Sequence, residues 1–131
     1  MLKNNFIFFI ISIAGLIVLF LVNLWGARRG YYRKGEENFW FDKVMHFWGG
    51  FFVAVFWFGL TQNSIYIILL TLITGIIWEI AEYIYGAYKF RKTRTDKYMT
   101  ETKDTLEDLF FDLLGAFSWL GFTNLIGYVI Q

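Results

Sequence analysis

The stretch FIFFIISIAGLIVLFLVNLW, residues 6–25, decides the fold class. It runs for about 20 residues without a charged side chain, which is the length of helix that crosses a hydrocarbon core of about 30 Å. A signal peptide is the alternative, but the apolar run is long and no A-x-A cleavage site follows it. The stretch therefore predicts a retained membrane-spanning helix.

The composition points to the same class of protein. The chain has 131 residues, is 57% hydrophobic and 23% aromatic, and contains no cysteine or proline. A soluble domain of this length could not bury so much apolar surface in one small core. The lack of cysteine also excludes disulfides, thiolate metal sites and cysteine nucleophiles.

Three further apolar runs follow the first, at residues 44–60, 65–85 and 106–130. The polar sequence TQNS, residues 61–64, joins the second run to the third and predicts a tight turn. We therefore expect an all-α fold, a polytopic integral membrane four-helix bundle formed by residues 1–131 as a single domain.

The basic residues predict the direction in which the helices cross. Apart from Lys3, every lysine and arginine lies within residues 26–43 or 86–105. Basic loops favour the cytoplasmic side of a membrane. We therefore expect a multi-pass protein of the inner cell membrane with both of these loops in the cytoplasm and both termini outside.

Three of the predicted helices carry ionisable residues at a similar depth, one to two turns inside the cytoplasmic boundary at about 5.4 Å per turn. Within each helix the spacing puts these residues on one face. Stripes of small residues, which include Gly50, Gly75 and Gly115, mark the same faces as the packed ones. The three groups are Asp42 and His46, then Glu79 and Glu82, and then Asp104, Asp108 and Asp112.

Converging carboxylates repel one another in a low dielectric, so some must be protonated or a cation must lie among them. A histidine nitrogen with carboxylate oxygens suits a divalent ion such as Zn²⁺ or Mn²⁺, whereas an all-oxygen subset suits Mg²⁺. The expected metal ligands are Asp42, His46, Glu79, Glu82, Asp104, Asp108 and Asp112. The expected catalytic residues, as ligands or acid–base groups, are His46, Glu79, Glu82, Asp108 and Asp112. Asp42 is expected to orient His46, and the expected phosphate-binding residues are Lys43, Lys89 and Arg91.

Structural roles compete with these assignments. Glu79 and Glu82 could form interhelical pairs, with Lys43 or Lys89 as partner. Asp42 and Asp104 could cap helix N-termini. A lone histidine is often satisfied within the packing of a protein, and Glu107 is offset from the acidic face and is expected at the interface.

Three sequences together resemble the pattern of the VanZ-like superfamily of small bacterial membrane proteins, including its YjdF-type branch. They are DKVMHFWGGFF (residues 42–52), WEIAEY (78–83) and DTLEDLFFDLLGAF (104–117). Asp112 and Glu82 depart from that pattern, which commonly has Asn and Gln there. The resemblance implies a role in the cell envelope, and the positions that it carries over are Asp42, Lys43, His46, Glu79, Glu82, Asp104, Asp108 and Gly115.

The sequence leaves three functions open. The first is a cation-binding protein that acts on a lipid or lipid-linked phosphate; as an enzyme, it would be a metal-dependent hydrolase or transferase. The second is a proton- or cation-coupled transporter, which would need a homo-oligomer because four short helices enclose little volume. The third is a membrane scaffold or regulatory subunit. Anionic or phosphate-bearing membrane lipids are the expected partners, and nucleic acid is not.

Overall fold

The computed structural model describes residues 2–29, 39–93 and 102–129, and all three segments are helical apart from the short turn at residues 61–63. Each helix contains a segment that is long and apolar enough to cross a membrane. The expected all-α, four-helix membrane architecture is confirmed. The helices are α1 (Leu2–Arg29), α2 (Phe39–Leu60), α3 (Ser64–Thr93) and α4 (Thr102–Val129).

The helices extend past the apolar runs that predict them. α2 begins at Phe39, so Asp42 and Lys43 lie in its first two turns and not in a loop. α3 continues to Thr93, and α4 starts at Thr102. Backbone hydrogen bonds continue a helix through turns whose side chains are polar, whereas hydropathy identifies only the apolar part of the helix.

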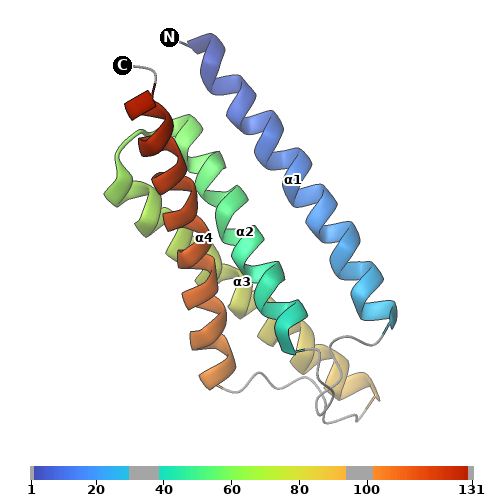
Figure 1. The fold of residues 1–131 in the computed structure, drawn as a ribbon. Helices are drawn as coiled ribbons and strands as arrows, with labels where there is room; N and C mark the ends of the chain where they lie inside the picture. Colours follow the sequence, from blue (N-terminus) through green and yellow to red (C-terminus); the bar gives the residue numbers. More distant parts are fainter. Residues whose placement is uncertain (1, 30–38, 94–101, 130–131) are drawn as a thin grey trace.

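α2 is the central helix, since it packs against each of the other three and most extensively against α4. Among the described residues, α1 packs chiefly on α2 and shows no close backbone approach to α3 or α4; it reaches α4 through the edge-to-face contact of Phe8 with Trp119. Figure 1 shows α1 running beside α2, with the start of α1 and the end of α4 at the same end of the bundle. The buried apolar core consists of Ala54, Val55, Ile67, Ala116, Trp119 and Leu120.

Two glycines bring the backbones of α2 and α4 together. A methyl group at Gly50 would overlap the backbone of Asp112, and one at Gly115 would overlap the backbone of Phe47. Small residues permit such close crossings in lipid, where helix association depends on direct packing. This crossing fixes Asp112 against α2.

The TQNS sequence forms the turn between α2 and α3. The side-chain oxygen of Asn63 accepts hydrogen bonds from the backbone N–H groups of Ile65 and Tyr66, at 3.0 and 3.3 Å. Asn63 therefore caps the N-terminus of α3, a position at which asparagine is favoured. The cap fixes the start of α3 and, further along it, the position of Glu79.

Candidate metal centre

The ionisable residues of α2, α3 and α4 meet at one end of the bundle. Seven carboxyl groups there lie around one lysine and one histidine, so carboxyl groups outnumber the groups that can carry a positive charge. The members of this acidic cluster are Asp42, Lys43, His46, Glu79, Glu82, Asp104, Glu107, Asp108 and Asp112.

Lys43 is the internal counter-ion of the cluster. Its side chain is fully buried, and Nζ donates hydrogen bonds to Asp104 Oδ1 at 2.8 Å and Asp108 Oδ1 at 2.5 Å. The carboxylates of Asp42 and Glu107 lie slightly further from Nζ, at 3.6 and 3.9 Å. Charge-assisted hydrogen bonds of this kind are among the stronger polar contacts in proteins. They tie the start of α2 to the start of α4.

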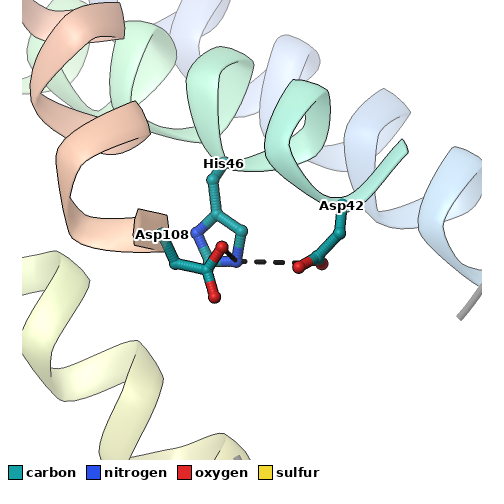
Figure 2. Close-up of side chains that lie close together, drawn as sticks. All are labelled: Asp42, His46 and Asp108. Carbon is teal, nitrogen blue, oxygen red and sulfur yellow. Dashed lines mark ion pairs between the residues drawn. The ribbon is translucent and has the colours of Figure 1, made fainter. Parts of the chain in front are cut away.

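His46 lies at the centre of the cluster and has different partners on its two nitrogens. Nδ1 lies 3.3 Å from Asp112 Oδ1. Nε2 faces Asp108 at 3.7 Å and the carboxylates of Asp42 and Glu79, both at 4.0 Å. Figure 2 shows the His46 ring directed between Asp42 and Asp108. In the tautomer with hydrogen on Nδ1, Asp112 accepts that hydrogen and the lone pair of Nε2 faces the remaining acids.

Glu79 is the least satisfied polar group of the cluster. Its side chain is 6% exposed, and neither carboxylate oxygen has a hydrogen-bond partner among the described residues. The Thr105 side chain approaches it without meeting hydrogen-bond geometry. A buried carboxylate without a partner is expensive, and Glu79 points its oxygens toward Nε2 of His46. Such a group is typical of a site that holds a ligand.

Two sets of three residues could each hold a metal ion, with ligand atoms within 4.8 Å of one another: Asp42, His46 and Asp108, or His46, Glu79 and Glu82. Both use His46, and they differ in the environment of their oxygens. Asp108 Oδ1 is already hydrogen-bonded to the Lys43 ammonium, and an ion bound there would be repelled by that positive charge at close range. Among the described residues, no ammonium or guanidinium group pairs with Glu79. The second set is therefore the better cation site.

The structure separates the other predicted site residues from this set. Asp104 contacts Lys43 and belongs to neither set of three. The expected role of Lys43 in binding phosphate does not fit its environment, because the ammonium is buried and its hydrogen bonds go to carboxylates. Lys89 and Arg91 lie on the last turns of α3, and their side chains are outside the described part of the structure.

One hydrogen bond of the site, between α3 side chains, is not among the contacts predicted from the sequence. Trp78 Nε1 donates a hydrogen bond of 2.9 Å to Glu82 Oε1. The four-residue spacing on one helix face could have indicated it. The contact holds one oxygen of Glu82, and it places an indole ring beside the candidate ligands.

A cavity of about 340 Å³ borders the cluster. Its walls come from α1, α2 and α3, with Asp112 as the single contribution of α4. His46, Glu82 and Asp42 line it, whereas Glu79 is not among its lining residues. A small molecule could therefore reach the imidazole and Glu82 without passing through the core.

Comparison with known proteins identifies the family. The family described as "Predicted membrane protein (DUF2238)" matches residues 3–127. The chain belongs to this family. It is an integral membrane protein with four candidate spans.

The resemblance to the VanZ-like superfamily is wrong, because the family that matches nearly the whole chain is a different one. A Thermotoga maritima protein, described as an uncharacterized protein, is 31% identical to this chain. That match covers 76% of this chain and 54% of the relative, so the chain spans about half the length of the curated relative it matches. No solved structure matches the chain.

Proposed function

We propose that this protein binds one divalent cation within the membrane through His46 Nε2, Glu79 and Glu82. The observation that carries the proposal is Glu79, which is buried, has no hydrogen-bond partner among the described residues, and faces Nε2. One imidazole nitrogen with two carboxylate oxygens suits Zn²⁺ or Mn²⁺. Three protein ligands would leave a coordination position open, as in catalytic metal sites.

The surroundings of His46 support this assignment. A histidine that binds a metal usually donates its other ring N–H to a carboxylate, which fixes the tautomer. Asp112 is the carboxylate at Nδ1, at 3.3 Å. In this proposal Asp112 orients His46, the role that the sequence argument gave to Asp42. Asp42 lines the cavity and becomes available as an acid–base group.

The substrate that we propose is the phosphate group of a membrane lipid. A bound divalent ion can polarise a phosphoryl oxygen and offset its negative charge, which the acidic cluster alone would repel. Asp42 Oδ1 lies 4.0 Å from Nε2 of His46, where it could accept a proton from an attacking water. The reaction class is metal-assisted hydrolysis or transfer at phosphate. We further propose that the cluster lies in the cytoplasmic leaflet of the inner membrane, because the basic segments 26–43 and 86–105 connect the helix ends beside it.

Metal analysis of the purified full chain tests the cation site. After dialysis against buffer that contains zinc and then against buffer without it, we expect about one zinc ion per chain in the wild type. Glu79→Gln replaces a charged carboxylate ligand by an uncharged amide. The variant should retain less than about a tenth of that zinc. Glu107→Gln is the matched control, since Glu107 lies near Lys43 and outside both sets of candidate ligands. Equal zinc content in wild type and Glu79→Gln would refute the site.

Asp112→Asn should weaken zinc binding without removing a ligand. The amide is uncharged and no longer raises the basicity of the imidazole, so we expect the affinity for zinc to fall by about 10- to 100-fold. Competition with a chromophoric chelator measures that affinity. An unchanged affinity would show that Asp112 has no influence on the imidazole, and a complete loss of zinc would indicate that Asp112 is itself a ligand.

A further inference from the structure

The cavity beside the acidic cluster lies between α1 and α3, over α2. α1 and α3 form two of its walls, yet these helices do not contact one another within the described residues. α2 forms the floor between them, and the contact of α1 with α4, between Phe8 and Trp119, lies nearer the start of α1 than the groove does. A molecule dissolved in the membrane could therefore enter between α1 and α3 without crossing a packed helix interface.

The lining of this groove changes in character along its length. The end near the cluster is polar, with Asp42, His46 and Glu82. The opposite end is formed largely by apolar side chains, including Leu16 of α1 and Val53 of α2, together with the hydroxyl groups of Thr71 and Thr74. The groove therefore matches a molecule with a charged head and an apolar body.

The length of the groove matches one leaflet of a bilayer. Its lining extends from Asp42 to Val53 on α2 and from Thr71 to Glu82 on α3. Each of these stretches is about 16 Å long at about 1.5 Å per residue. That is roughly half of a hydrocarbon core about 30 Å thick. The volume of about 340 Å³ falls in the range of about 300–1,000 Å³ that small-molecule sites occupy.

We propose that this groove holds one hydrocarbon chain of a phosphate-bearing lipid, which enters between α1 and α3 and places its phosphate beside His46 and Glu82. The placement of the phosphate rests on the proposed cation site, whereas the placement of the chain rests on the groove itself. In this proposal the protein selects its substrate by the hydrocarbon chain as well as by the phosphate group.

Two glycines allow a matched test. Gly49 lines the groove, and a methyl group there would meet only Asp112 Oδ1, at 3.9 Å. Gly49→Leu therefore projects a side chain into the groove. Gly121 has no atom within 4 Å of an added methyl and lies on the exposed surface of α4, so Gly121→Leu is the control. Leu16→Trp fills the groove from α1, at the end far from the cluster.

The experiment measures binding of dioleoyl phosphatidic acid to the zinc-loaded full chain in detergent micelles by native mass spectrometry. Dioleoylglycerol supplies the chains without phosphate, and inorganic phosphate supplies the head without chains. We expect the wild type and Gly121→Leu to bind phosphatidic acid alike. Gly49→Leu and Leu16→Trp should bind it at least tenfold more weakly, with Leu16→Trp retaining its zinc and its affinity for inorganic phosphate.

Each outcome decides between the two proposals. Wild-type binding of phosphatidic acid by zinc-loaded Leu16→Trp would overturn the groove and leave the cation site standing. Absence of zinc from the wild type, with phosphatidic acid binding still lost in Leu16→Trp, would overturn the cation site and uphold the groove. If the groove variants instead dissociate a dimer, the occupant is a second copy of this chain and the lipid proposal is wrong.

Discussion

Lys43→Met is expected to lower the midpoint of thermal unfolding in detergent by at least about 10 °C. The substitution removes the fully buried ammonium that donates hydrogen bonds to Asp104 and Asp108 and offsets their negative charge. Removal of one partner of a buried ion pair costs about 3–5 kcal/mol, because the other charge is left uncompensated. A loss of that size corresponds to a shift of this order for a chain of this length.

The cause of this loss can be isolated by removing charge from the partner as well. In Lys43→Met/Asp108→Asn, the buried carboxylate that contacts Nζ at 2.5 Å is neutral, and much of the lost stability should return. Arg28→Met serves as the control, since it removes a cation from an exposed position near the end of α1. If the double variant is as unstable as Lys43→Met, the lysine stabilises the fold through its packing and not through its charge.

Gly50→Ala is expected to separate α2 from α4 and to weaken zinc binding at the same time. The added methyl group would overlap the backbone of Asp112, which cannot rotate away as a side chain can. Overpacking typically costs about 1–3 kcal/mol, and relief of this overlap must shift Asp112 away from Nδ1 of His46. We expect the unfolding midpoint to fall by about 5 °C or more and the affinity for zinc to fall at least tenfold.

The neighbouring glycine provides the control for this prediction. Gly49→Ala makes the same chemical change one residue earlier in α2, where the nearest atom, Asp112 Oδ1, lies at an ordinary contact distance of 3.9 Å. It should unfold and bind zinc as the wild type does. Thermal unfolding and chelator competition on both variants make the comparison. Equal behaviour of the two would show that α2 and α4 do not cross at Gly50.

The sequence predicts the fold well because the membrane restricts the choice of structure. A helix satisfies its own backbone hydrogen bonds, so four apolar runs imply four helices. Hydropathy does not determine where those helices end: α2 begins at Phe39, before the apolar run at 44–60. Nor does it predict that α1 packs chiefly on α2, because every face of α1 is apolar enough for lipid.

The sequence predicts the depth of each site residue in the membrane and the helix face on which it lies. It does not predict which residues of different helices meet. Spacing within each helix brings Asp42 and His46 to one face, and likewise Glu79 and Glu82. It cannot show the rotation of one helix against another, and this rotation puts Asp112 at Nδ1 and Asp108 at Lys43. The same restriction explains the wrong family resemblance, since acids and histidines three or four residues apart are what any packed polar helix face in lipid requires.

The bond between Lys43 and the acids of α4 has a consequence for the order in which the protein is made. The ribosome completes α2 before it reaches α4, and in that interval the nearest acid to Lys43 along the chain is its neighbour Asp42. The newly inserted α2 therefore holds an incompletely neutralised cation in the bilayer until α4 arrives with Asp104 and Asp108. Docking of α4 is then the step that neutralises the Lys43 ammonium. It makes the last stage of assembly favourable without any bound ligand.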